Sequence, residues 1–253
     1  MTRPLVIGHR GASAHAPENT LAAFQMAIDA GAEGVEFDVR LAKDHIPVVI
    51  HDHDLKRTGL RSERVADLTS DELNKIDIGS WFNLRFPKRS RPEFADQTVP
   101  TLGQVLNLLA DFGGLIYIEL KPRQSDHLRL TEVVCELIKD SPLLPQMIVK
   151  SFKLAVIPNI KHLLPEVQTA ALFAPAIMHF LRHREHIVTL AKEFGADQIS
   201  IHHTLVTPKL SKLAAEADLP VTVWTVDDPR WLSRRNSLKI RALITNDPAK
   251  FLK

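Results

Sequence analysis

Residues 115–151 read LIYIELKPRQSDHLRLTEVVCELIKDSPLLPQMIVKS, and this stretch decides the fold class. It opens with the apolar run Leu115–Leu120 and closes with the apolar run Met147–Ser151, each of which has the length of a buried strand. Between them, Thr131–Ile138 carries apolar residues at helical spacing. Two strands joined through a helix lie parallel in one sheet, so the stretch predicts a βαβ unit.

The alternation of short apolar runs with helix-period segments recurs along the chain, which indicates repeated βα units. Thr20 and Thr101 each stand directly before such a helical segment and are typical N-cap residues. An open doubly wound sheet is less favoured, because no glycine-rich phosphate loop follows the first strand. We therefore predict an α/β fold, a closed (β/α)8 TIM barrel. Its eight strands are expected at Leu5–Gly8, Val35–Arg40, Leu115–Leu120, Met147–Ser151, Thr169–Phe173, Gln198–His202, Val221–Thr225 and Ala242–Thr245.

The composition fits one globular barrel. A length of 253 residues is typical of this fold, and 45% hydrophobic with 25% charged residues can bury a full core. The formal net charge of +2 comes from 32 basic and 30 acidic residues. This balance is too slight and too evenly mixed to predict a nucleic-acid partner, whereas a small-molecule substrate fits it.

The start of the chain shows no targeting pattern. Residues 1–9 contain only a short apolar run, so we expect neither a signal peptide nor a membrane span and predict a cytoplasmic protein. The single cysteine, Cys135, lies in a helical pattern and is expected to be buried rather than catalytic. The sequence leaves the oligomeric state open.

Residues 53–98 interrupt the repeat, because they carry no clear βα unit. A segment of this length inside a compact domain is usually functional or a small subdomain, and in a barrel it lies over the carboxyl-terminal face of the strands. The simpler alternative is a solvated excursion held by aromatic side chains such as Trp81, Phe82 and Phe86. We expect residues 1–253 to form a single domain that contains this insertion.

Residues 41–50 are too few for a crossover helix, so we predict that they return as a hairpin on the strand before them. With a two-residue turn at Asp44 and His45, His51 lies opposite Asp38 and shares its face of the sheet. A register that differs by one residue would instead turn His51 away.

Carboxylates gather at the ends of two predicted strands. Glu36 lies two residues before Asp38, so both side chains point to the same face. Two carboxylates this close repel each other unless a proton or a cation lies between them, and hard divalent cations prefer oxygen ligands. Glu119 ends a neighbouring strand and can complete a site of three carboxylates.

Basic residues and histidines stand beside these carboxylates. Arg10 and Lys121 are the natural phosphate ligands, since arginine offers a bidentate fork and lysine a point charge. His9 and His51 can flank a metal ion as general acid and base. No packing reason places these groups at the ends of the first three strands. They suggest metal-assisted cleavage of a phosphate ester.

Short motifs in a fixed order contain most of these residues: His9-Arg10-Gly11-Ala12-Ser13, Pro17-Glu18-Asn19-Thr20, Glu36-Phe37-Asp38-Val39, His51-Asp52, Gly79-Ser80-Trp81-Phe82, Val99-Pro100-Thr101-Leu102, Ile118-Glu119-Leu120-Lys121, Trp224-Thr225-Val226 and Thr245-Asn246-Asp247-Pro248. In order and spacing they resemble the signature of the glycerophosphodiester phosphodiesterase family, in its cytosolic bacterial type. The resemblance covers nearly the whole chain.

The resemblance implies a distorted (β/α)8 barrel with a small insertion after the second strand. It also implies an enzyme that hydrolyses glycerophosphodiesters, the deacylated phospholipids, to sn-glycerol 3-phosphate and an alcohol. By similarity, a Mg²⁺ or Ca²⁺ ion is expected on Glu36, Asp38 and Glu119. The same resemblance makes His9 and His51 the general acid and base, Arg10 and Lys121 the phosphate ligands, and Trp224 a wall against the carbon skeleton of the substrate.

Departures from the family pattern leave alternatives open. His45 stands where the family usually has glycine, at a turn position that asks for a positive φ. A lysophospholipase D that acts on longer lipids remains an alternative function, and so does a catalytically silent binding protein. The sequence also leaves open the preferred headgroup, the native metal, and which histidine is the base.

Overall fold

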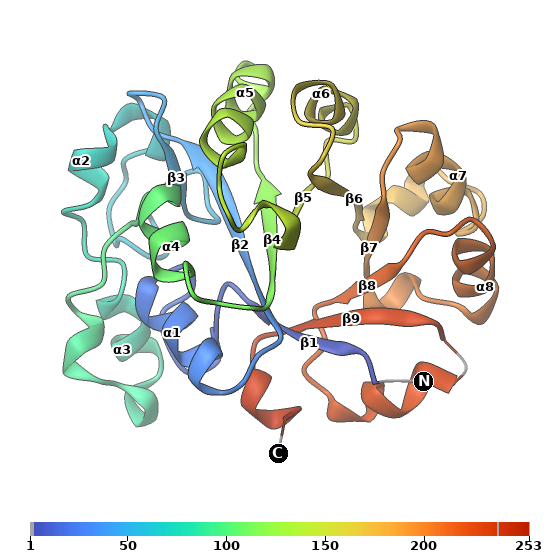
Figure 1. The fold of residues 1–253 in the computed structure, drawn as a ribbon. Coiled ribbons are helices and arrows are strands. Elements are labelled where there is room, and N and C mark those ends of the chain that lie inside the picture. The colour runs from blue at the N-terminus through green and yellow to red at the C-terminus, as the bar shows by residue number, and fades with distance from the viewer. Residues whose placement is uncertain (1–2, 237, 253) are drawn as a thin grey trace.

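The computed structural model describes residues 3–236 and 238–252, and the parallel strands in these ranges close into a barrel (Figure 1). β1 pairs with β9 on one side and with β2 on the other, which closes the ring. The predicted TIM barrel is confirmed, and each predicted strand end lies within two residues of an observed one. The barrel strands are β1 Leu5–His9, β2 Gly34–Leu41, β4 Leu115–Leu120, β5 Met147–Ser151, β6 Gln168–Phe173, β7 Gln198–His202, β8 Val221–Trp224 and β9 Ile240–Thr245.

Helices form the outer layer of the barrel (Figure 1). The Thr20 hydroxyl accepts the Ala23 N–H at the start of α1, and Thr101 forms a capping box with Gln104 at the start of α4, so both predicted N-caps are confirmed. The ring is irregular, because 3-10 turns at Pro229–Asn236 and Pro248–Lys250 follow the last two strands. The outer helices are α1 Leu21–Asp29, α4 Leu102–Leu108, α5 His127–Ile138, α6 Val156–Leu163, α7 His186–Glu193 and α8 Pro208–Glu216.

Apolar side chains fill the lower part of the barrel interior. Ile7, Tyr117 and Ile148 meet there with small or branched residues of the other strands. Side chains alternate between the two faces of a strand, so the residues two positions further along, among them His9 and Lys150, turn toward the same interior at the carboxyl ends. This apolar layer therefore lies beneath the polar groups at the mouth of the barrel.

The hairpin after β2 exists, but its predicted register is wrong by one residue. β3 Pro47–Val49 runs antiparallel to β2, with Val39 opposite Val49, so His51 is not the partner of Asp38. The turn has three residues, 43–45, and is closed by the Ala42 N–H donating to the Ile46 carbonyl at 3.0 Å. His45 takes the left-handed conformation at φ 62°. Three-residue hairpin turns need such a residue, and that odd length shifts the register.

The segment between β3 and α4 lies beside α1 and α4 at one side of the barrel (Figure 1). It consists of short helices, α2 Ser70–Leu73 and α3 Ser80–Arg85, together with three 3-10 turns. Phe82 and Phe94 of this segment pack against Ala16 and Ala23 near the start of the chain. An insertion after the second barrel strand is therefore present, while its treatment as a subdomain at 53–98 within one domain stays a prediction.

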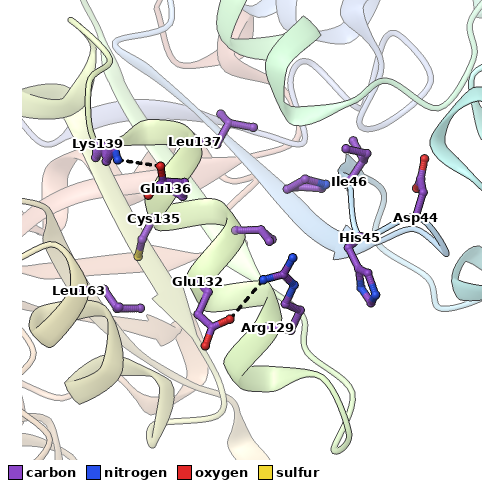
Figure 2. A pocket seen from close by; sticks show the side chains of 12 residues that line it. Asp44, His45, Ile46, Arg129, Glu132, Cys135, Glu136, Leu137, Lys139 and Leu163 are labelled. Atoms are coloured by element: carbon purple, nitrogen blue, oxygen red, sulfur yellow. Dashed lines mark hydrogen bonds and ion pairs between the residues drawn. The ribbon is translucent and has the colours of Figure 1, made fainter.

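Two further expectations concern the outer layer. Cys135 is buried in α5, as predicted, and it borders a hollow of about 560 Å³ between the hairpin turn, α5 and α6 (Figure 2). None of the predicted site residues lines this hollow. Across residues 3–236 and 238–252, every helix is too short or too polar to cross a membrane.

Candidate active site

Three carboxylates converge inside the mouth of the barrel. Glu36 and Asp38 come from β2 and Glu119 from β4, and an oxygen of each lies within 4.8 Å of the others. The parallel register places Asp38 opposite Glu119, which brings the two strands' carboxylates together. All three side chains are buried. The predicted convergence of these residues is therefore present.

Two of the predicted cations contact this cluster. Arg10 Nε lies 3.1 Å from Asp38 Oδ2, and Lys121 Nζ lies 3.3 Å from Asp38 Oδ1. Lys121 Nζ also lies 2.5 Å from Glu119 Oε1. Asn19 adds a neutral contact, since its Nδ2 donates to Asp38 Oδ2 at 2.9 Å. Asp38 is thus held from three directions.

Lys150 is a third cation in the cluster, and the sequence reasoning missed it. Its Nζ lies 2.8 Å from Glu36 Oε1 and 3.9 Å from Glu119 Oε2, and the side chain is only 2% exposed. The available signal was a lysine inside the apolar strand Met147–Ser151, two residues after the inward-facing Ile148. A lysine is almost never fully buried without a partner, so this position pointed to nearby carboxylates.

The charges of the cluster act on one another strongly. Burial alone would raise the pKa of Asp38, but Arg10 and Lys121 hold that pKa well below its usual range. Burial likewise opposes ionisation of Glu36, and Lys150 lowers the pKa of Glu36. Burial and the neighbouring Asp38 raise the pKa of Glu119, which has the least compensated charge of the three.

His9 ends β1 and is held by a neutral partner. Its Nδ1 lies 2.6 Å from Asn246 Oδ1, and its Nε2 faces the cluster at 4.0 Å from Glu36 Oε2. The side chain is 17% exposed. Burial lowers the pKa of His9, and the attraction of Glu36 opposes that shift only in part. The neutral imidazole, with one nitrogen directed into the site, is therefore favoured.

His51 lies in a bend after β3, so the pairing register of the hairpin no longer governs where its side chain points. Its Nδ1 lies 2.8 Å from Asp52 Oδ1, and Asp52 Oδ2 accepts from Arg57 Nε at 2.7 Å. Arg57 in turn makes two 2.7 Å contacts with Glu18. His51 is one of the groups that lower the pKa of Asp38.

Two arginines, Arg10 and Arg40, connect the segment around His51 to residues of the barrel strands. Glu18 Oε1 accepts from Arg10 NH1 at 2.7 Å, which joins the His51 network to the carboxylate cluster. Arg40 donates to the carbonyl oxygens of His51, at 2.8 Å, and of Lys121, at 3.2 Å. Neither Arg40 nor Arg57 stood out in the sequence, because their partners come from other segments of the chain.

Trp224, at the end of β8, lies on the opposite side of the mouth in an aromatic group. Its ring contacts His202 at 5.1 Å and Phe152 at 5.6 Å between centroids. Lys121 Nζ lies 5.8 Å from the Phe152 ring, which links this group to the charged cluster. The indole Nε1 is buried without a hydrogen-bond partner in the described structure. It is a free donor at the rim of the site.

The residues present fit a hard divalent cation. The donor set consists of three buried carboxylates on rigid strands, which offer oxygen atoms alone. Lys121 Nζ lies near Glu119 Oε1, and a carboxylate oxygen has lone pairs for a further partner, so this oxygen can still bind a cation. A cation among these oxygens would also offset the repulsion that raises the pKa of Glu119.

Comparisons with known proteins agree over the whole chain. Residues 9–250 match the family described as glycerophosphoryl diester phosphodiesterase. A glycerophosphodiester phosphodiesterase of Caldanaerobacter subterraneus is 30% identical over 246 residues, which cover 97% of this chain and 95% of that protein. Among solved structures, an Oleispira antarctica phosphodiesterase in complex with the product sn-glycerol-3-phosphate has a TM-score of 0.84 and 26% identity, over 98% of this chain and 95% of that one. A Thermotoga maritima glycerophosphodiester phosphodiesterase has a TM-score of 0.77 and 26% identity, over 100% and 98% of the two chains.

Proposed function

We propose, since this chain belongs to the glycerophosphoryl diester phosphodiesterase family, that it hydrolyses glycerophosphodiesters to sn-glycerol 3-phosphate and an alcohol with the help of a divalent cation. The observation that carries the proposal is the group of three buried carboxylates beside two histidines and three cations at the mouth of the barrel. The product bound in the Oleispira antarctica structure supports the same substrate class.

Glu36, Asp38 and Glu119 would hold the cation, and Mg²⁺ or Ca²⁺ suits their oxygen donors. When bound, the cation supplies positive charge that polarises the phosphate and neutralises charge in the transition state. The remaining acceptor capacity of Glu119 supports this assignment.

Arg10 and Lys121 would bind the phosphate. Both contact Asp38 from the open side of the cluster, with 17% and 13% of their side chains exposed, so a phosphate oxygen can reach them. Trp224 would pack against the carbon skeleton of the substrate, and its unpaired Nε1 adds a donor for a hydroxyl or phosphate oxygen. The phosphate would then lie between the aromatic group and the carboxylates.

His9 and His51 would act as general base and general acid. They come from two different elements: His9 ends β1 with its Nε2 4.0 Å from Glu36 Oε2, and His51 follows β3, the strand that pairs with β2. One histidine removes a proton from the attacking oxygen while the other protonates the leaving alcohol. In-line displacement at phosphorus would require the two histidines to act on opposite sides of the phosphorus atom.

The test is release of glycerol 3-phosphate from glycerophosphocholine and glycerophosphoethanolamine, with and without EDTA, by the wild type and by His9→Ala and Glu36→Ala. We expect release that EDTA abolishes, that Mg²⁺ or Ca²⁺ restores, and that both variants lack. Release that persists in EDTA would contradict the role of the cation. A wild type that releases nothing with any divalent ion would contradict the substrate class.

A second substrate class, the lysophospholipids, is favoured by apolar side chains exposed on and after α3. Leu84 is 71% exposed and Phe86 36% exposed. Trp81 and Phe86 also line a hollow of about 350 Å³ that borders Asn246, the partner of His9. Lysophosphatidylcholine belongs in the same assay. Turnover of this lipid that Leu84→Ser reduces, with glycerophosphocholine turnover unchanged, would identify a lipid diesterase.

A further inference from the structure

Asn246 and Asp227 form a hydrogen-bonded pair behind His9. Asn246 directly follows β9, and Asp227 lies three residues after β8. Asn246 Nδ2 donates to Asp227 Oδ2 at 2.8 Å, and the Asn246 backbone N–H donates to Asp227 Oδ1 at 2.9 Å. The Thr245 hydroxyl donates to the same Oδ1 at 3.0 Å. Three donors thus fix the Asp227 carboxylate against Asn246.

This arrangement fixes which way the Asn246 amide points. Both oxygens of the exposed Asp227 carboxylate act as acceptors, since the Asn246 N–H and the Thr245 hydroxyl donate to Oδ1 and the Asn246 amide lies against Oδ2. A flipped amide would place its oxygen against a carboxylate oxygen, two acceptors with no proton between them. The amide nitrogen must therefore face Asp227, and the amide oxygen must face His9 and the Ser13 hydroxyl, which donates to it at 3.0 Å.

The fixed amide oxygen in turn determines the tautomer of His9. An oxygen acceptor 2.6 Å from Nδ1 requires that Nδ1 carries the hydrogen. The lone pair of the neutral ring then lies on Nε2, the nitrogen that faces the carboxylate cluster. We propose that Asp227 and Asn246 are positioning residues that hold His9 as the Nδ1–H tautomer, so that Nε2 is the proton acceptor of the reaction. The inference rests on the proposed function for its catalytic meaning.

The hydrogen bond from the Asn246 amide nitrogen to the Asp227 carboxylate can be tested by exchanging donor and acceptor. In Asp227→Asn, residue 227 can offer an N–H to Asn246, so the Asn246 amide is free to flip and to present its N–H to His9. We expect kcat to fall by about 10- to 100-fold, the usual effect of losing an outer hydrogen-bond partner, with KM little changed. The swap Asp227→Asn with Asn246→Asp restores an acceptor toward His9, and we expect it to recover part of the lost kcat, because the acceptor is then a carboxylate rather than a neutral amide.

The tautomer can be read without any turnover. Nitrogen NMR of protein labelled in histidine, with the His9 signals identified by their loss in His9→Asn, distinguishes the protonated ring nitrogen from the bare one. We expect protonated Nδ1 in the wild type and in the swap, and a change in Asp227→Asn. Asp228→Asn is the matched control, since Asp228 pairs with Arg230 outside the site and its loss should leave kcat unchanged.

Several outcomes would overturn the inference. A wild type with protonated Nε2 would do so, and so would an Asp227→Asn variant that is folded and within about twofold of wild-type kcat. A swap that is as slow as the single variants would reduce the pair to a structural role. If Asp227→Asn does not fold, Asn246→Ala replaces it as the test variant. An unchanged kcat in Asn246→Ala would contradict the inference. A wild type without diesterase activity contradicts the proposed function alone, because the NMR result still decides the tautomer.

Discussion

His9 and His51, the two proposed catalytic histidines, are held in opposite ways. His9 ends a barrel strand and bonds to a neutral amide, whereas His51 lies in a bend, is 32% exposed and bonds to the Asp52 carboxylate. The charge of the partner at Nδ1 is therefore what distinguishes the two rings, and under the proposed function it would separate the proton acceptor from the proton donor.

Removal of either ring should give the largest effect. We expect His9→Ala and His51→Ala each to reduce kcat by about 10²- to 10⁴-fold, the range for a general acid or base. The double variant should be little slower than the worse single variant, because the two groups act as a unit. Steady-state kinetics of the three variants on glycerophosphocholine checks this. Losses that multiply would separate the two histidines into independent roles.

The next effect concerns Lys150, which compensates Glu36 in the carboxylate cluster. Lys150→Met leaves a buried carboxylate without its partner, so we expect a loss of about 3–5 kcal/mol in the free energy of unfolding at neutral pH. Chemical denaturation in EDTA measures it. Lys153→Met is the control, because Lys153 contacts the exposed Gln124 outside the cluster.

The direction of the Glu36 pKa shift determines how this loss of stability depends on pH. Lys150 lowers the pKa of Glu36 in the folded protein, so the stability that it contributes is present above the ordinary glutamate pKa of about 4.3 and disappears as the pH falls through the lowered value. The difference between wild type and Lys150→Met should therefore shrink on acidification. A difference that is constant with pH would show a packing effect instead.

A smaller effect should follow from making the partner of His51 neutral, like that of His9. Asp52→Asn keeps the shape of the side chain but removes the charge that bonds His51 Nδ1 and Arg57. We expect kcat to fall by about 10- to 100-fold, with the fold intact. Kinetics with a matched thermal unfolding curve checks it. Full activity would mean that the acid needs no carboxylate, and the comparison with His9 would fail.

The smallest effect belongs to the hairpin tip, which precedes His51 but lies outside the site. His45 holds φ 62°, a conformation that costs a side chain about 1–2 kcal/mol and that glycine adopts freely. Replacement of His45 by glycine removes this cost, but the greater conformational freedom of glycine in the unfolded chain offsets part of the stabilisation. We expect His45→Gly to raise stability by up to about 1 kcal/mol with kcat unchanged. A loss of activity would show that the tip positions His51.

Strand alternation and parallel register explain how much of the molecule the sequence predicted. Glu36, Asp38 and Glu119 follow from inward positions on neighbouring strands, and the structure brings them together. The register of His51 failed, because turn length depends on one left-handed residue, His45, that no hydrophobic pattern reports. The family resemblance is what keeps His51 among the proposed site residues.

The missed residues share a physical cause. Lys150 and Asp227 act through partners that are distant in sequence: Lys150 of β5 contacts Glu36 of β2 inside the barrel, and Asp227 contacts Asn246 across two strand ends. Such pairs leave no local periodicity. Asn246 lay inside a recognised motif, but its role depends on the Asp227 side chain that orients it.

The central claim is that Glu36, Asp38 and Glu119 hold one divalent cation that hydrolysis requires. Calorimetric titration of the EDTA-treated chain with Ca²⁺ or Mn²⁺, followed by an activity assay of the same samples, tests it most directly. We expect one cation per chain in the wild type, none in Glu119→Gln, and release of glycerol 3-phosphate that rises with cation occupancy. Equal binding by the two proteins, or full release from the cation-free wild type, would contradict the claim.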